Sequence, residues 1–189
     1  MSITREQAHG ILLKYMTGDR YIKHSYAVEC IMRGLAKRLD PSREEFWGVC
    51  GLLHDLDEEQ CDWEHDLSVH GPTSVELLKK EGVDDTELFD AICAHNPKSG
   101  VRAKTNLQYA LLAADPMSGF VKAVAQIYPD KKVASVKAKS VAKRFNEARF
   151  AAGANREYMM AIEHTGLTLD DLIEIALTEM TAVADTLGL

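Results

Sequence analysis

The spacing of apolar residues limits the possible folds of this chain more than any other feature of its sequence. Apolar residues recur every three or four positions in most segments, and one segment shows this with special clarity: Ile22, Val28, Ile31, Met32, Leu35 and Leu39. This spacing gathers apolar side chains on one face of an α-helix. No segment shows the sustained apolar–polar alternation of a half-buried strand. The sequence therefore predicts an all-α protein, a helical bundle in a single domain.

Capping patterns and apolar stripes predict where individual helices begin and end. Thr4-x-x-Gln7 and Ser42-x-x-Glu45 have the residues of a capping box, and each is followed by apolar residues at helical spacing. Pro72 suits the first turn of a helix that Gly82 ends. The other predicted helices cover about residues 20–39, 43–54, 104–115, 116–127, 136–152 and 155–164, one that begins at Asp84 or Asp85, and a last one from Thr168 to about Leu187.

Composition and charge exclude several classes of protein. With 189 residues, 46% of them hydrophobic and 27% charged, the chain can bury a core as one domain over residues 1–189. We expect no signal peptide and no membrane association, because the N-terminus lacks an apolar stretch and the apolar runs are too short to cross a bilayer. Four cysteines without a CxxC pair are typical of buried thiols in a reducing compartment, which predicts a cytoplasmic protein. The net charge of −7 argues against stable nucleic-acid binding.

The charge is unevenly distributed along the chain. Residues 131–149 carry a net charge of +6, which leaves −13 for the rest. Such a run is most often a solvated helix face. The alternative is a basic rim that attracts an anionic substrate.

Several histidines and aspartates occupy positions where the helical pattern predicts burial. His24 shares a helix face with Val28 and Ile31, and His95 shares one with Ile92 and Leu88. The dipeptide His54-Asp55 ends the strongly apolar segment VCGLLHD, and Asp115 follows Leu111 by four residues and Leu107 by eight. These side chains come from four predicted helices and point toward the core or its edge.

Burying these polar side chains without compensation would cost several kcal/mol or more. A lone inward histidine is more often a hydrogen-bonded core residue, and a lone buried aspartate is more often a helix cap. For the whole set, a shared divalent cation is the better explanation, because it pairs with the carboxylates and accepts the imidazole lone pairs. A second His-Asp pair, His65-Asp66, lies in a polar segment with no apolar run before it, and we expect it on the surface.

This pattern resembles the HD superfamily of metal-dependent phosphohydrolases over roughly residues 20–120, with residues 121–189 as a helical extension. The resemblance implies that His24, His54, Asp55 and Asp115 bind a first metal ion. His70 in VHGP and His95 in AHNP resemble the additional histidines of the binuclear members of the superfamily, in which Asp55 would bridge two ions.

One position departs from the pattern of several binuclear HD families. These families have a lysine three residues after the His-Asp pair, and this chain has Glu58 there, in HDLDE. A glutamate would repel a phosphate group. A cationic role beside Asp55 in catalysis would then fall to Arg20, one turn before His24, or to Lys98, just beyond His95, although both suit ordinary solvated surface as well.

The resemblance implies hydrolysis of a phosphoester or phosphoanhydride in a nucleotide or other small phosphorylated metabolite. The cofactor would be one or two divalent ions of Fe, Mn, Zn or Co, with Mg as a further option. Two alternatives stay open: an HD-type di-iron oxygenase, which would use the same ligands, and a non-catalytic nucleotide-sensing HD module. Motifs for other nucleotide-dependent enzymes are absent. The sequence is compatible with a homo-oligomer.

Overall fold

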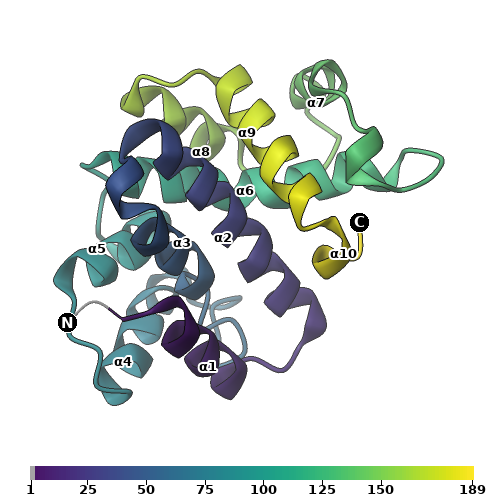
Figure 1. Cartoon of the computed structure of the whole chain (residues 1–189). Coiled ribbons are helices and arrows are strands. Elements are labelled where there is room, and N and C mark those ends of the chain that lie inside the picture. Colours follow the sequence, from purple (N-terminus) through teal and green to yellow (C-terminus); the bar gives the residue numbers. More distant parts are fainter. Residues whose placement is uncertain (1–2) are drawn as a thin grey trace.

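A computed structural model describes residues 3–189, which form a single all-helical domain (Figure 1). Ten α-helices and five short 3-10 helices cover these residues, and no strand occurs among them. The predicted all-α class is therefore confirmed. Within the described part of the chain, no helix has both the length and the apolar character needed to cross a membrane.

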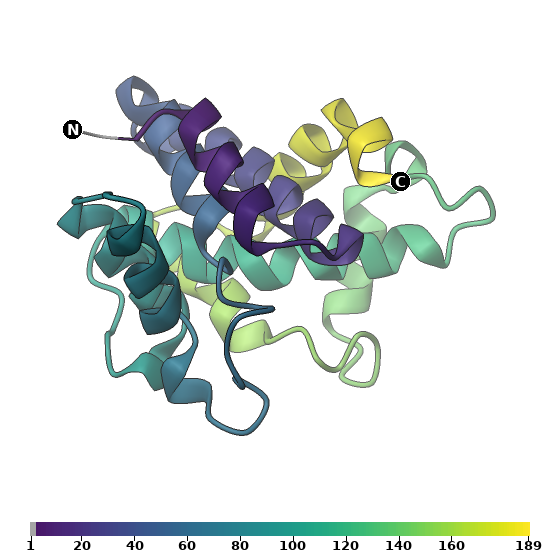
Figure 2. The ribbon, with the colours of Figure 1, turned by 90° about the horizontal axis from the view of Figure 1, so that it is seen from below.

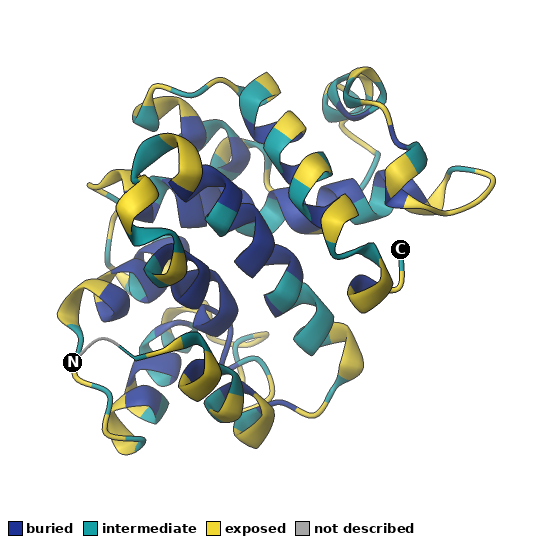
Figure 3. Cartoon of the chain, viewed as in Figure 1, coloured by how far each residue is buried: buried dark blue, intermediate teal, exposed yellow. Residues whose placement is uncertain are grey.

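Two long helices form the centre of the molecule. Helices α2 (Asp19–Leu39) and α6 (Asn106–Gln126) pack together, and α3 (Glu44–Leu53) lies along α2. Their apolar stripes are buried, as the dark blue faces in Figure 3 show. Seen from below, α6 crosses the middle of the molecule, with α2 and the C-terminal helices on one side and α8 on the other (Figure 2).

The remaining helices surround this centre. Helix α1 packs on α3, α5 packs on α6 beside α4, and α8 and α9 also contact α6. Capping boxes at Thr4, Thr105 and Thr168 start α1, α6 and α9. The bounds of these helices are α1 (Arg5–Tyr15), α4 (Pro72–Lys80), α5 (Thr86–His95), α7 (Ala138–Phe145), α8 (Arg156–Met160), α9 (Leu169–Ala182) and α10 (Ala184–Leu187).

The close approach of α2 and α3 depends on a glycine. A Cβ atom added to Gly51 would lie 2.9 Å from the carbonyl oxygen of Val28 and 3.0 Å from the Cα of Glu29. No side chain fits in that space, so glycine lets the two backbones meet. The contact lies about one helical turn from both His24 and His54, and it thereby brings these two histidines together.

The structure corrects three predicted helix boundaries. Helix α6 continues through Pro116, where the sequence predicted two helices, because the apolar residues on both sides are buried in one core. The predicted capping box at Ser42 does not form, since Ser42 lies within the 3-10 helix Pro41–Arg43 that precedes α3. The predicted last helix is divided at Val183.

The segment after α7 is also less helical than predicted. Helix α7 ends at Phe145, whereas the sequence predicted a helix to about residue 152. In the turns that follow, one nitrogen of the Arg156 guanidinium donates to the carbonyl oxygens of Ala151 and Ala154, at 2.6 and 2.7 Å. These bonds satisfy carbonyls that lie outside any helix, and they hold the turns beside α8.

Candidate metal centre

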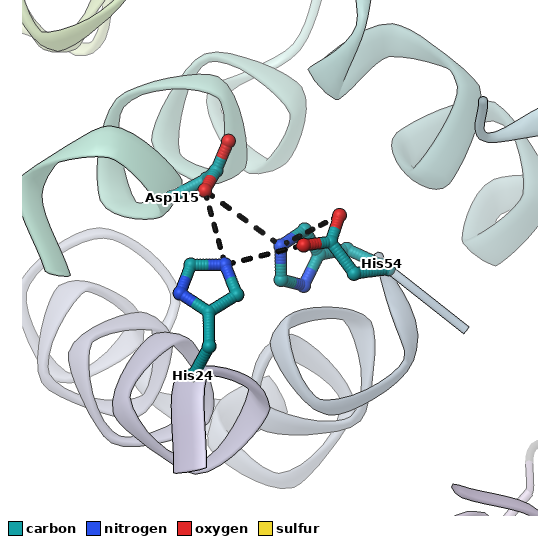
Figure 4. Close-up of side chains that lie close together, drawn as sticks. His24, His54 and Asp115 are labelled. Atoms are coloured by element: carbon teal, nitrogen blue, oxygen red, sulfur yellow. Dashed lines mark ion pairs between the residues drawn. The ribbon is translucent and has the colours of Figure 1, made fainter. Parts of the chain in front are cut away.

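Three helices bring the first group of predicted residues to one point (Figure 4). His24 from α2, His54 at the end of α3 and Asp115 from α6 point toward one another, and Asp55 completes the group. The Nε2 atom of His24 lies 3.2 Å from Asp55 Oδ2 and 3.2 Å from Asp115 Oδ1. The Nε2 atom of His54 lies 3.1 Å from Asp55 Oδ1 and 3.9 Å from Asp115 Oδ1.

A second group shares Asp55 with the first. The Nε2 atoms of His70 and His95 each lie 3.3 Å from Asp55 Oδ1, and they are 3.0 Å apart. His95 is the last residue of α5 and His70 directly precedes the glycine that caps α4. All six predicted residues therefore meet in one double cluster, with the carboxylate of Asp55 between its two halves.

The Nδ1 atoms of these histidines are held on the side away from the cluster. His54 Nδ1 lies 2.8 Å from the carbonyl oxygen of Gly51, and His95 Nδ1 lies 2.5 Å from that of Ile92. Because a carbonyl only accepts, both Nδ1 atoms carry a proton, and the Nε2 atoms face the cluster. His24 Nδ1 lies 3.1 Å from the hydroxyl of Ser118. A donor atom oriented through its other ring nitrogen is typical of metal-binding histidines.

Asp57 orients His70, and sequence reasoning did not identify it. Its fully buried carboxylate lies 2.9 Å from His70 Nδ1 and accepts the backbone N–H of Gly71 at 2.7 Å. Gly71 has φ +92°, a conformation that glycine adopts without strain, and its N–H points at the carboxylate. The signal in the sequence was the second aspartate of HDLD, two residues after Asp55. Ser118, a polar residue on the buried face of α6, was also missed.

Two observations indicate that the double cluster can bind divalent cations. His54 Nε2 and Asp55 Oδ1 are buried and have no hydrogen-bond partner, which is costly unless another group binds them. The Nε2 atoms of His70 and His95 face each other 3.0 Å apart, and the Nδ1 atom of each ring already has an acceptor. Two nitrogens about 2.0–2.1 Å from a common ion would have such a separation. The six side chains can thus hold one or two ions.

The carboxylates of the cluster stay charged although they are buried. Burial lowers the pKa of His24, but the carboxylates of Asp115 and Asp55 outweigh this effect and raise the pKa to about 9. For His54, burial likewise lowers the pKa, and the charge of Asp55 together with Asp115 raises it to about 10. Burial raises the pKa of Asp55, yet the surrounding histidines, His54 first, hold it well below its usual value. The buried carboxylates are therefore charged and attract positive charge.

Two cavities open on the cluster. Cavity A has a volume of 270 Å³ and is bordered by α2, α6 and the C-terminal residues, including Arg20, Tyr21, Lys23, Lys122, Met180 and Leu187. Cavity B has a volume of 670 Å³, and its lining includes Trp63, Leu67, Lys98, Pro116, Asn155 and Tyr158. His24, Glu58 and Gly119 line both. A substrate can therefore reach the cluster from either side.

The predicted cationic residues lie in different cavities. Arg20 lines cavity A and Lys98 lines cavity B, and both are exposed. Glu58 lies between the two cavities, where burial and then the charge of Asp55 raise its pKa to about 7. The catalytic roles expected for Asp55, Arg20 and Lys98 stay predictions.

The histidines and basic residues that the sequence did not assign to the metal site lie outside the double cluster. His65 is 82% exposed and pairs only with Asp62, in agreement with its predicted surface position. His164 is exposed, lies in the last turn of the 3-10 helix Ala161–Thr165 and stacks on Tyr109. None of the basic residues of the segment 131–149 lines cavity A or B, and most of them are exposed.

Comparison with known proteins gives one match. A family model described as the HD domain matches residues 21–161, which is more than half of the chain. The matched range includes all six residues of the double cluster. No curated protein and no solved structure matches this chain.

Proposed function

The chain belongs to the HD-domain superfamily of metal-dependent phosphohydrolases, and from this premise we propose that it hydrolyses a phosphoester or phosphoanhydride bond in a small phosphorylated compound, such as a nucleotide. The single observation that supports this proposal is the double cluster beside two cavities. In it, Asp55 Oδ1 and His54 Nε2, two atoms that can bind a metal ion, are buried without a hydrogen-bond partner. If these side chains had only a structural role, they would not need unpartnered buried polar atoms beside two cavities.

Hydrolysis at this site consumes one water molecule. The water oxygen bonds to phosphorus, the P–O bond to the leaving group breaks, and the leaving oxygen takes up a proton from the water. Bound divalent ions would lower the pKa of water toward neutrality and offset the charge on the phosphoryl oxygens. Histidine with carboxylate ligands suits Fe, Mn, Zn or Co, with Mg as a weaker match.

The residues of the chain would hold and orient the reacting groups. His24, His54, Asp55 and Asp115 would bind one ion, and Asp55, His70 and His95 a second. The cationic side chains of Arg20 and Lys98 are the candidates for holding phosphoryl oxygens, because each lines a cavity that reaches the cluster. The carboxyl of Glu58 lies in both cavities, and its raised pKa reduces its repulsion of a phosphate near neutral pH.

Metal analysis coupled to a substrate screen tests this function. The protein is purified without added metal, its metal content is measured, and phosphatase and phosphodiesterase substrates are screened with Mn²⁺, Fe²⁺, Zn²⁺ and Co²⁺. We expect hydrolysis that Asp55→Ala removes and that His65→Ala, in the exposed second His-Asp pair, leaves unchanged. Hydrolysis that is equal in Asp55→Ala, or no hydrolysis of any ester, would contradict the proposal.

The presence of Glu58 favours one alternative function, that of a di-iron oxygenase, which can be tested. A carboxylate at this position suits a di-iron oxygenase better than a site that must bind phosphate, and the double cluster would serve both chemistries. Two equivalents of iron, oxygen uptake with a reduced substrate and no hydrolysis would support the oxygenase. Hydrolysis under anaerobic conditions would exclude oxygen as a required reactant.

A further inference from the structure

Cavity A is lined by more cationic than carboxyl side chains: Arg20, Lys23 and Lys122 against Asp55 and Glu58. The carboxylate of Asp55 already faces the histidines of the cluster. Lys23 pairs with Asp19 at 2.8 Å, but Arg20 and Lys122 have no carboxylate partner within residues 3–189. The guanidinium of Arg20 stacks 4.5 Å from the ring centroid of Tyr21 and donates to its hydroxyl at 2.8 Å. In a chain of net charge −7, unpaired cations beside a cavity favour an anionic ligand.

Cavity B has a different chemistry. Trp63, Leu67, Pro116 and Tyr158 give it aromatic and apolar walls, and Leu67 is 46% exposed there. The indole N–H of Trp63 donates to the carbonyl oxygen of Glu58 at 3.2 Å, which fixes the ring beside the cluster. Its ring centroid lies 6.2 Å from that of His70. An exposed apolar wall next to a polar centre suits a flat organic group.

The amide side chains in cavity B do not change this chemistry. Asn96 donates to the carbonyl oxygens of Leu67 and His70, and Asn155 accepts the N–H of Tyr158 as a helix cap. Both amides thus hold the backbone of the cavity wall. The aromatic rings, together with the side chain of Lys98, are therefore the groups left to contact a ligand.

Gly119 lies where the two cavities meet. It is exposed in the middle of α6, one turn after Asp115 and one turn before Lys122, and it lines both cavities. A Cβ atom added there would meet nothing within 4 Å, so packing does not require a glycine. A glycine inside a helix is destabilising relative to alanine. Space for a ligand that crosses from one cavity to the other accounts for that cost.

We propose that the substrate is a two-ended phosphorylated compound that spans the metal centre, with a second anionic group against Arg20 and Lys122 in cavity A and an aromatic ring against Trp63 and Tyr158 in cavity B. This inference rests on the proposed hydrolysis, because the scissile phosphate would lie at the cluster between the two ends. The volumes of 270 and 670 Å³ match a small anionic group and a larger ring system.

Binding of phosphonates that resist hydrolysis tests each end separately. Calorimetry of the Mn²⁺-loaded protein compares methylphosphonate, methylenediphosphonate with its second anionic group, and benzylphosphonate with its aromatic ring. We expect methylenediphosphonate to bind about tenfold more tightly than methylphosphonate, since its second anionic group can accept charge-assisted hydrogen bonds. We expect benzylphosphonate to bind about fivefold more tightly, from contact with aromatic side chains.

The variants must separate the two preferences. Arg20→Ala combined with Lys122→Ala is expected to remove the preference for methylenediphosphonate and to leave that for benzylphosphonate, whereas Trp63→Leu should do the reverse. Lys139→Ala, on α7 outside both cavities, is the matched charge control and should change neither. Absence of either preference in the wild-type protein, or persistence of a preference in its own variant, overturns the inference.

The glycine gives a third, independent measurement. Gly119→Leu should weaken the binding of methylenediphosphonate and benzylphosphonate more than that of methylphosphonate, and Gly10→Leu, in the middle of α1 with no neighbour within 4 Å, should not. Equal effects on all three probes contradict a passage at Gly119. If the binding pattern appears without hydrolysis of any ester, the proposed function fails and the two-ended site stands; hydrolysis without the pattern gives the opposite result.

Discussion

The carboxylate of Asp57 shows how a side chain outside the candidate ligand set can determine the geometry of the cluster. It contacts the Nδ1 atom of His70 and the N–H groups of Gly71 and Ser74, so it connects the turn after α3 to the start of α4. The Nε2 atom of His70 faces Asp55 as long as this contact fixes the ring. The second half of the double cluster therefore depends on a residue that is not one of its six members.

Asp57→Asn is predicted to weaken metal binding in the second half of the cluster. The amide keeps the size of the side chain but removes the charge that orients His70 and makes it more basic. Loss of such a partner lowers metal affinity by about 10- to 100-fold. Titration with Mn²⁺ against a competing chelator measures this, and Asp62→Asn, on the exposed partner of His65, is the matched control. Equal affinities in Asp57→Asn and the wild type would show that His70 needs no such partner.

Neighbouring glutamates are predicted to change stability with pH in opposite directions. Burial raises the pKa of Glu58 to about 7 from 4.5, so the metal-free protein loses stability from this group as pH rises from 4.5 to 7. Backbone N–H groups of Gly18 and Thr17 lower the pKa of Glu59, which therefore contributes stability above pH 4.5 and loses it as pH falls.

Thermal unfolding in chelator at pH 5 and pH 8 measures the difference between the two glutamates. Glu58→Gln should raise the Tm relative to wild type at pH 8 and change it less at pH 5. Glu59→Gln should lower the Tm at pH 8, because its amide accepts the N–H of Thr17 without a charge. A shift of the same sign for both variants at pH 8 would contradict the environments that the structure gives them.

Among the elements, the crossing of α2 and α3 is predicted to depend on Gly51. A Cβ atom there would lie 2.9–3.0 Å from the backbone of α2, so Gly51→Ala forces the helices apart and should destabilise the protein by about 1–3 kcal/mol. Gly10→Ala, in α1 with open space around it, should instead stabilise by about 0.5–1 kcal/mol. Urea unfolding measures both. Stabilisation by Gly51→Ala would contradict the close contact.

The sequence predicts which residues lie on the inner faces of helices better than it predicts where helices end. Helical spacing alone placed His24, His95 and Asp115 inward, because a buried position depends only on the residues three and four places away. The boundaries depend on distant contacts: α6 passes through Pro116 because its two halves share one core, and Arg156 stabilises turns where the sequence predicted more helix. Neither effect leaves a local pattern.

The same distinction applies to the candidate site. Helical spacing predicted that His24, His95 and Asp115 would lie inward near His54-Asp55, and the resemblance to a known family added His70. The role of Asp57 was not predicted, because its contact with His70 depends on the path of a turn of irregular sequence. The unpaired Lys122 and the open space at Gly119 became visible only once α2 and α6 were seen side by side.

For the whole molecule, bound metal is predicted to be a major part of folding stability. The double cluster joins α2, the end of α3, the start of α4, α5 and α6, so ions held there connect the central helices that form the core. An ion at 100 times its dissociation constant stabilises the folded state by about 2.7 kcal/mol, or about 5–10 °C in Tm for a chain of this size. Without ions, only the protons on the histidines neutralise the charge of the buried carboxylates.

Differential scanning calorimetry with and without chelator tests this contribution. The wild-type protein should lose about 5–10 °C in Tm when metal is removed. Asp55→Asn should show little of this shift, because one change removes the carboxylate common to both halves of the cluster, whereas Asp66→Asn, in the exposed His-Asp pair, should keep all of it. In Asp55→Asn no carboxylate remains between the two groups of histidines. A full metal-dependent shift in this variant would therefore mean that the stabilising ion binds elsewhere.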